Sequence, residues 1–299
     1  MTVFVAGGCS WDSIVYLEAF PERTETRFAR DFQETLGSSG SGKSLNLGRL
    51  RIDTRFHAMI GEDRFGEAIR ERLADEPIDF RFDVDPNGTE RHVNLMNDAG
   101  ERISIFVVPP TQEPEIDYEP LKAWTAEADA LVVSPVDYSR QLLPAAAEAE
   151  TPVWADVHAY DGEDEYHEDF LAAADYLFMS DEGMADPREF MRERIDAGTR
   201  LVVCTRGADG ATALTADGEW IEVAAGDFEM VDTNGAGDAF FAGYFYGHRQ
   251  GEDVQTCLEL GTLVGGLAVE SRDLAHPDLS PDRLAELYEA RYDDEFLDA

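Results

Sequence analysis

Short apolar runs separated by helical segments dominate the middle of the chain. Each run is bounded by turn-forming residues, as buried parallel strands are. The runs cover residues 3–6, 131–134, 153–156, 176–180 and 201–205, and the helical segments cover residues 65–74, 141–149 and 187–197. Strands that alternate with helices predict an α/β fold, with a doubly wound, mainly parallel sheet flanked by helices.

A different pattern runs from residue 91 to residue 108, where Val93 and Leu95 alternate with polar residues before the turn sequence NDAG, and Ile103, Ile105 and Val107 alternate again after it. It predicts a β-hairpin with one apolar face. A single hairpin is only marginally stable in water, and the segment 14–36 can supply more strands. We expect these insertions, about 14–36 and 88–108, to form a small β-sheet lid at the carboxyl-terminal edge of the main sheet. Residues 1–299 then form a single domain.

The last third of the chain is rich in small residues and helical in pattern. We expect helices over residues 237–247, 254–270 and 281–292. In the last of these, Leu284, Leu287 and Tyr288 recur at helical spacing, which indicates a stripe that faces the core.

A glycine-rich turn, in the sequence VDTNGAGDAF, leads directly into the first of these helices. The amides of Ala236, Gly237 and Asp238 lie in the first helical turn, where they have no partner inside the helix and the helix dipole is positive. Together with Gly235 they predict an anion hole for a phosphoryl group, with Asp238 placed to take the proton of an acceptor hydroxyl. The structural alternative is that Asp238 only caps the helix.

The segment DTNGAGDAF resembles the C-terminal signature of the ribokinase-like, or PfkB-type, carbohydrate and nucleoside kinases. The resemblance implies a doubly wound α/β fold with a β-sheet lid and ATP-dependent phosphoryl transfer to a hydroxyl of a small sugar or sugar derivative. It also implies Mg²⁺ and allows a monovalent cation such as K⁺. By this resemblance Asp238 is the catalytic base, and Gly235, Ala236 and Gly237 form the anion hole.

Two further segments are similar to the acceptor-binding motifs of the same family. GGCSWD resembles its first strand and turn, which implies that Asp12 binds acceptor hydroxyls. GSGKSLN resembles its glycine-rich motif, which implies that Gly42, Lys43 and Asn46 contact the acceptor. In this chain Ser41 interrupts the usual pair of glycines.

The resemblance also implies which residues bind the nucleotide. VCTRGADG resembles the strand and loop that contact ATP, which assigns Thr205, Gly207 and Gly210 to the nucleotide, together with Asp232 and Thr233 of the signature.

One segment departs from the family pattern. Where the family has N-x-x-E after a strand, this chain has SDEG at 180–183, so Asp181 or Glu182 is expected to serve Mg²⁺ at a shifted position. The same departure motivates an alternative of another class, a catalytically silent ligand-binding protein that kept the fold. The intact Asp238 and its glycines oppose that alternative.

The sequence GSSGSGKS at 37–44 also satisfies the Walker pattern, so a P-loop nucleotidase that uses Lys43 is a second alternative. A P-loop follows a buried hydrophobic strand, whereas residues 28–36 alternate like a half-exposed one. Both interpretations require ATP. They place Lys43 at the phosphates in one case and near the acceptor in the other.

The nature of the acceptor stays open at this level. Asp12 and Asn46 suit a molecule rich in hydroxyl groups, and a neutral sugar is our first choice, ahead of a sugar acid. A sugar phosphate would use a cation such as Lys43 or Arg49. A nucleoside would need an aromatic slot in the lid; the aromatic residues available are Trp11, Phe28 and Phe32.

The charge of the chain is extreme, with 63 acidic and 24 basic residues and a formal net charge of -39. Its carboxylates are spread along the chain, and Lys43 and Lys122 are the two lysines. Molar salt screens such self-repulsion, so we expect a halophile's protein in a salt-rich cytosol, with an ordinary acidic protein as the alternative. Without a basic stripe, nucleic acid is not an expected partner.

The location and assembly of the chain follow from three smaller observations. Its three cysteines lack metal-site spacing, and we find neither an export signal nor a run of 18 apolar residues, so a cytoplasmic protein that does not bind membranes is expected. If the hairpin at 91–108 exposes an apolar outer face, two lids can cover each other in a homodimer.

Overall fold

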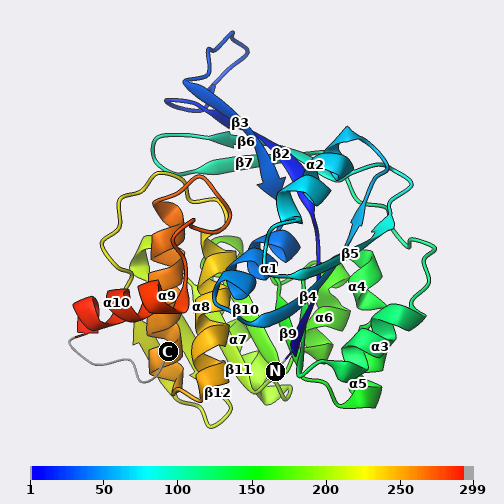
Figure 1. Cartoon of the computed structure of the whole chain (residues 1–299). Coiled ribbons are helices and arrows are strands. Elements are labelled where there is room, and N and C mark those ends of the chain that lie inside the picture. Colours follow the sequence, from blue (N-terminus) through cyan, green and yellow to red (C-terminus); the bar gives the residue numbers. More distant parts are fainter. Residues whose placement is uncertain (1, 293–299) are drawn as a thin grey trace.

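A nine-stranded sheet forms the middle layer of the computed structural model, which describes residues 2–292 (Figure 1). In order across the sheet the strands are β13 (Trp220–Val223), β12 (Ala211–Thr215), β11 (Leu201–Thr205), β10 (Tyr176–Ser180), β9 (Val153–Asp156), β8 (Ala130–Val133), β1 (Thr2–Ala6), β4 (Asp53–Ile60) and β5 (Asp79–Val84). Neighbours pair in parallel except at β12, which is antiparallel to both β11 and β13. The predicted doubly wound, mainly parallel sheet is confirmed.

Helices cover both faces of this sheet (Figure 1). The helices on one face are α1 (Ser39–Arg49), α2 (Arg64–Leu73), α8 (Ala236–Gln250), α9 (Val254–Val269) and α10 (Pro281–Tyr292). Those on the other are α3 (Glu119–Glu127), α4 (Asp137–Arg140), α5 (Leu143–Ala149), α6 (Glu168–Ala173) and α7 (Pro187–Asp196). Successive residues of a strand alternate between the two cores, so Val3 and Val5 join the first core while Phe4 joins the second.

A separate four-stranded sheet stands at one end of the large sheet (Figure 1). Its strands are, in order, β3 (Asp31–Gly37), β2 (Ser10–Tyr16), β6 (Arg91–Met96) and β7 (Arg102–Val108). β6 and β7 form the predicted hairpin. Only residues 7–9 separate β1 of the large sheet from β2, so the first strand runs almost directly from one sheet into the other. We call this four-stranded sheet the lid sheet.

Short 3₁₀ turns mark the carboxyl ends of two neighbouring strands of the large sheet. They are η2 (Asp181–Gly183), after β10, and η3 (Gly207–Asp209), after β11; a third, η1 (Glu165–His167), precedes α6. Because β10 and β11 are parallel with Ser180 opposite Thr205, η2 and η3 lie at the same edge of the sheet.

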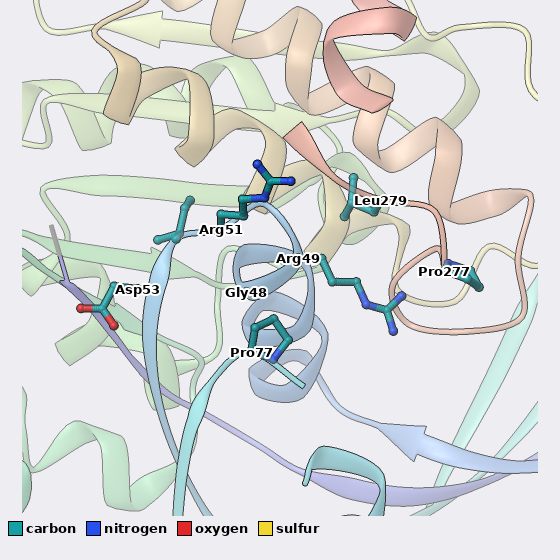
Figure 2. Close-up of a pocket in the computed structure, with 8 residues that line it drawn as sticks. Gly48, Arg49, Arg51, Asp53, Pro77, Pro277 and Leu279 are labelled. Carbon is teal, nitrogen blue, oxygen red and sulfur yellow. The ribbon is translucent and has the colours of Figure 1, made fainter. Parts of the chain in front are cut away.

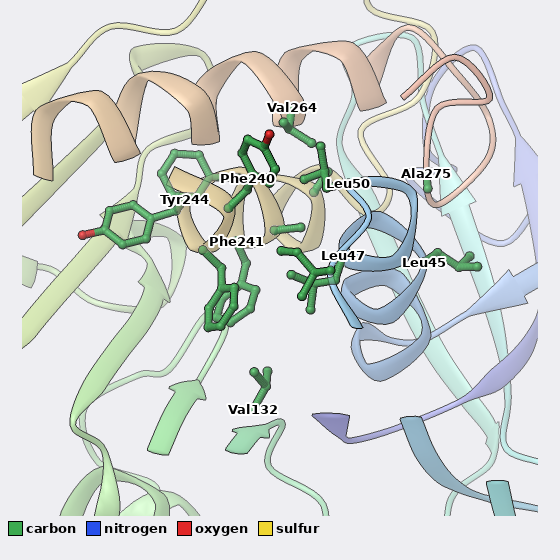
Figure 3. Close-up of a cluster of buried hydrophobic side chains, with 14 of the residues drawn as sticks. Leu45, Leu47, Leu50, Val132, Phe240, Phe241, Tyr244, Val264 and Ala275 are labelled. Atoms are coloured by element: carbon green, nitrogen blue, oxygen red, sulfur yellow. The ribbon is translucent and has the colours of Figure 1, made fainter. Parts of the chain in front are cut away.

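Packing between helices fixes the start of α8. Leucines of α1 meet aromatic residues of α8 in the first core, and α9 packs along the other side of α8 (Figure 3). Gly243 permits this close approach, because a Cβ there would lie 2.6 Å from the carbonyl oxygen of Leu260. The amino terminus of α8 is thereby held beside α1. No helix within residues 2–292 has the length and apolar content needed to cross a membrane.

Candidate active site

A fully buried lysine joins three separate elements at the carboxyl edge of the large sheet. Lys43 of α1 is 0% exposed, and its Nζ lies 2.5 Å from Oδ1 of Asp238 and 2.8 Å from Oδ2 of Asp156. Asp238 belongs to the first turn of α8, and Asp156 ends β9. Burial acts to lower the pKa of Lys43, but the two carboxylates raise it above its ordinary value, so the side chain is an ammonium ion.

The second oxygen of Asp238 faces a glycine. A Cβ on Gly42 would lie 2.5 Å from Oδ2 of Asp238, so the missing side chain keeps space beside that oxygen. One oxygen of the carboxylate is thus held by Lys43, and the other borders a space that only glycine leaves open. Gly42, Lys43 and Asp238, which were singled out from motifs nearly two hundred residues apart, are in direct contact.

The glycine-rich turn forms the amino terminus of α8 as predicted. Gly235 has φ 82°, a left-handed conformation that favours glycine, and the amide of Ala236 donates to the carbonyl of Thr233 at 3.3 Å. The amides of Gly237 and Asp238 follow in the first helical turn, where helix geometry gives them no intrahelical acceptor. A Cβ on Gly237 would meet no atom within 4 Å, so this turn borders open space. An anion can approach these amides.

Asp12 lies buried on β2 in a network of donors. Ser10 Oγ donates to its Oδ1 at 2.7 Å, and Asn94 Nδ2 donates to its Oδ2 at 3.0 Å. His92 forms an ion pair with Oδ1, at 3.2 Å from its Nδ1. Gly37, at the end of β3, leaves no room for a side chain next to this carboxylate. The segment 37–42 therefore runs from the Asp12 carboxylate to the Asp238 carboxylate.

Two buried amide oxygens near these carboxylates have no hydrogen-bond partner among the described residues. Asn46 donates through Nδ2 to the carbonyls of Gly42 and Leu274, both at 2.8 Å, and its Oδ1 stays unpaired. Asn94 uses Nδ2 on Asp12, and its Oδ1 is likewise unpaired. Buried acceptors of this kind are rare in proteins, and a ligand hydroxyl can satisfy them.

The residues assigned to the nucleotide fall into two groups in space. Thr205 ends β11, where its Oγ1 donates to the carbonyl of Met179 at 3.3 Å, and Gly207 opens η3 with free space around its Cα. Gly210 has φ 92° and packs against the backbone of Val223, so it shapes the turn.

The second group contacts the lid sheet. Asp232 is buried and accepts hydrogen bonds from the Tyr16 hydroxyl at 2.5 Å and from the Asn234 amide at 2.8 Å. Burial raises the pKa of Asp232 above its ordinary value. Thr233 Oγ1 donates to the carbonyl of Gly100, in the hairpin turn, at 3.1 Å. The side chains of Asp232 and Thr233 thus tie the lid sheet to the glycine-rich turn.

The carboxylates expected to serve magnesium lie in η2, directly after β10. Across residues 2–292 no group of three or more His, Cys, Asp or Glu residues is arranged to hold a metal ion. Mg²⁺ does not require a group of three protein ligands, because it commonly binds one or two carboxylates, substrate phosphates and waters. Asp181 and Glu182 lie at the same sheet edge as Thr205 and Gly207, and two carboxylates suffice as the protein's share of such ligands.

A surface pocket of about 670 Å³ lies elsewhere, at the carboxyl end of α1 (Figure 2). Arg49, which lines it, donates to the carbonyls of Ala275 and His276 and pairs with Glu76 at 2.9 Å. Arg51 of the same pocket pairs with Asp282 at 3.3 Å. Arg49 is therefore held at this pocket by groups of the protein itself.

Sequence reasoning missed several of these residues. Asp156, His92 and Asn94 come from strands far from the motifs, and each reaches the site only through the pairing of neighbouring strands. The polar ends of apolar runs were a usable signal for Asp156. For His92 and Asn94 the signal was weaker, since they alternate with apolar residues in the hairpin as any surface residue would.

A family profile and two known proteins match most of this chain. The profile of the pfkB family carbohydrate kinases matches residues 5–281. An acarbose 7(IV)-phosphotransferase of Actinoplanes sp. is 31% identical over 89% of this chain and 91% of its own length. An ATP-dependent ribose-1-phosphate kinase of Halopiger xanaduensis is 28% identical over 97% of this chain and 99% of its own length.

Solved structures share the fold. A microbiome-derived acarbose kinase superposes with a TM-score of 0.85 at 24% identity, covering 96% of this chain and 98% of that one. The ribokinase of Arabidopsis thaliana, solved with ribose and ATP, superposes with a TM-score of 0.77 at 21% identity, covering 95% of this chain and 97% of that one.

Proposed function

Since this chain belongs to the pfkB family of carbohydrate kinases, we propose that it transfers the γ-phosphoryl group of ATP to a hydroxyl group of a small sugar or sugar derivative. The observation that carries the proposal is the contact of Lys43 with Asp238 at the amino terminus of α8. There a carboxylate able to accept a proton and a set of amides able to bind a phosphoryl group lie on the same helical turn.

In this proposal the two oxygens of Asp238 have separate tasks. Lys43 holds Oδ1, while the acceptor hydroxyl approaches Oδ2 over Gly42 and gives up its proton there as it attacks phosphorus. The first-turn amides of α8 meet the charge on the transferred group, and Thr205 and Gly207 border the nucleotide. Mg²⁺, when bound, neutralises charge on the phosphates, and Asp181 and Glu182 are the residues that would hold it. A monovalent cation such as K⁺ is part of the proposal as well.

A neutral sugar is the acceptor that the site supports best. Lys43 forms ion pairs with two carboxylates, and Arg49 is hydrogen-bonded at the surface pocket at the carboxyl end of α1. Neither side chain is free to bind a phosphate on the acceptor. The unpaired oxygens of Asn46 and Asn94 and the Asp12 carboxylate instead accept hydrogen bonds, which hydroxyl groups donate. The ribose-1-phosphate kinase among the relatives keeps a sugar-phosphate kinase as the alternative, with a nucleoside kinase behind it.

The P-loop alternative has less support. The sequence GSSGSGKS begins at Gly37, the last residue of β3 in the lid sheet, and continues into α1, so it does not follow a strand of the parallel sheet. Lys43 lies inside that helix and is buried in ion pairs.

The first test is ATP consumption in molar KCl with Mg²⁺ against neutral sugars, sugar acids, sugar phosphates and nucleosides. Asp238→Asn should lower kcat by about 10²–10⁴-fold, because the base is lost while the shape is kept. Asp253→Asn, at the start of α9, removes a comparable carboxylate away from the site and should not.

The outcomes separate the alternatives. Acceptor-dependent turnover that depends on Asp238 establishes the kinase and names its acceptor class. Nucleotide binding without turnover on any acceptor favours the silent binding protein. Hydrolysis without an acceptor that is abolished by Lys43→Ala favours the P-loop nucleotidase.

We also propose that the protein is a cytoplasmic homodimer adapted to high salt. The outer strand β7 carries Ile103 and Ile105 on one side, and they are 42% and 49% exposed. An exposed apolar edge strand of this kind usually has a partner, and a second lid sheet is complementary to it.

A further inference from the structure

A buried histidine lies between two carboxylates beside the candidate acceptor site. His92 Nδ1 is 3.2 Å from Oδ1 of Asp12, and its Nε2 is 2.8 Å from Oε1 of Glu90. All three residues are buried, at 7% exposed for His92, 2% for Asp12 and 5% for Glu90. An ionised carboxylate only accepts hydrogen bonds, so both ring nitrogens must carry hydrogen. An imidazolium ring, with hydrogen on both nitrogens, satisfies both contacts.

We propose that His92 is a positioning residue that orients the Asp12 carboxylate to receive an acceptor hydroxyl. The inference rests on the proposed function, in which Asp12 binds the acceptor. His92 is placed to act through Asp12, and Glu90 in turn holds the far side of the imidazole ring.

The hydrogen bonds around Asp12 show why its orientation matters. Its Oδ1 is occupied by Ser10 and His92, whereas its Oδ2 accepts from Asn94 and retains capacity for one more donor. An acceptor hydroxyl that donates to this oxygen must find it in a fixed direction. Three donors on one carboxylate fix that direction.

Among the described residues, His92 is the cation in contact with both Asp12 and Glu90. Arg91, the neighbour of His92 along β6, places its guanidinium over the Phe65 ring, 3.9 Å from the ring centroid. Burial and the nearby Glu90 raise the pKa of Cys9, so this thiol stays neutral. The Phe106 ring covers the imidazole at 4.1 Å between ring centroids. Without His92, the two buried carboxylates of Asp12 and Glu90 would lack the cation that contacts both of them.

The pKa of His92 agrees with this geometry. Burial acts to lower it, but Asp12 and Glu90 outweigh burial and raise it to about 9. His92 therefore carries its charge at neutral pH and loses it as the pH passes about 9. Over that range Asp12 should lose its fixed orientation.

Two near-isosteric variants of His92 each keep one of its two hydrogen bonds, to Asp12 or to Glu90. The amide nitrogen of asparagine reaches the position of Nδ1, so His92→Asn keeps the bond to Asp12. The amide nitrogen of glutamine reaches the position of Nε2, so His92→Gln keeps the bond to Glu90 and loses the one to Asp12.

The experiment combines kinetics with NMR. With the sugar that turns over fastest in the acceptor panel, His92→Gln should raise the KM for the sugar about 10-fold, with the KM for ATP unchanged, because one charged hydrogen bond to Asp12 is gone. His92→Asn should stay within about 3-fold of wild type. In the wild type the KM for the sugar should rise above about pH 9, and that limb should be absent in His92→Gln.

In ¹³C-histidine-labelled protein, the His92 signal, identified by its loss in His92→Gln, should report an imidazolium at pH 7.5 and titrate near 9. A neutral His92 at pH 7.5 overturns the proposal even if no sugar turns over. Equal effects of both variants on the KM for the sugar, or an alkaline limb that persists in His92→Gln, also overturn it. Asp12→Asn distinguishes failure of the His92 proposal from failure of the proposed acceptor site. An unchanged KM for the sugar in that variant removes Asp12 from acceptor binding, whatever His92 does.

Discussion

At the scale of single residues, the most consequential contact is the one between Lys43 and its two carboxylates. Neither Asp156 nor Asp238 is left unpaired inside the protein, because one ammonium ion serves both. The same ion holds Oδ1 of the proposed base in place. Stability and proposed catalysis therefore depend on one side chain.

Replacing this lysine should destabilise the fold strongly. Lys43→Met keeps the length and volume of the side chain but leaves two buried carboxylates without a cation, which should lower the free energy of unfolding by about 3–5 kcal/mol. Urea denaturation monitored by circular dichroism measures it. Lys122→Met is the matched control, since Lys122 is exposed and pairs with Glu119 on the surface. Equal stability of the two variants would contradict the assignment of Lys43 as the ion that compensates the cluster.

The sequence predicted the part of the site formed by Gly42, Lys43 and Asp238 better than the part formed by Asp156 and His92. Gly42, Lys43 and Asp238 stand in contiguous motifs whose residue types are dictated by close backbone approach and proton transfer, so their spacing is visible along the chain. Asp156 and His92 reach the site through strand register and through the order of strands in two sheets. Neither property is encoded in a local pattern.

At the scale of elements, the lid sheet differs from the large sheet in what covers it. Residues alternate along β6 between buried and half-buried, whereas β7 is exposed along nearly its whole length. Its apolar side chains Ile103 and Ile105 lie on one side of the strand, and Ser104 lies on the other.

The proposed dimer predicts a difference between these two sides. Ile105→Glu places a charge in the proposed interface and should convert a dimer to a monomer in sedimentation velocity at 2 M KCl, because a buried unpaired carboxylate is costly. Ser104→Glu puts the same charge on the opposite side of β7 and should leave the dimer intact. A wild-type protein that sediments as a monomer at micromolar concentration would rule out this assembly.

At the scale of the whole molecule, charge is the dominant property. A net charge of -39 on 299 residues repels itself at low ionic strength, and screening reduces that repulsion. The ion pairs near the site are buried, so salt should affect them much less than the surface carboxylates.

The melting temperature should therefore rise as KCl increases from about 0.1 to 2 M, over which the Debye length falls from about 10 Å to below 3 Å. Differential scanning fluorimetry measures this shift. Sorbitol at matched osmolality is the control, because it favours compact states without screening charge. A melting temperature that rises equally in sorbitol, or does not rise in KCl, would favour an ordinary acidic protein.

Much of the architecture was predictable because burial leaves a direct trace in the sequence. The five apolar runs are strands of the large sheet, the alternating segment is a hairpin, and the three C-terminal helices are present. The order of the strands and the antiparallel edge formed by β12 and β13 were not predicted, since an apolar run has the same appearance in either direction.

The burial of Lys43 also gives the protein an internal reporter of its own opening. Of its two lysines, the folded chain presents Lys122 to an amine-reactive reagent and withholds Lys43, while the unfolded chain presents both. Opened and closed molecules therefore differ by one adduct in intact-mass spectra. The rate at which that adduct appears would measure how often α1 and α8 separate, without any engineered label.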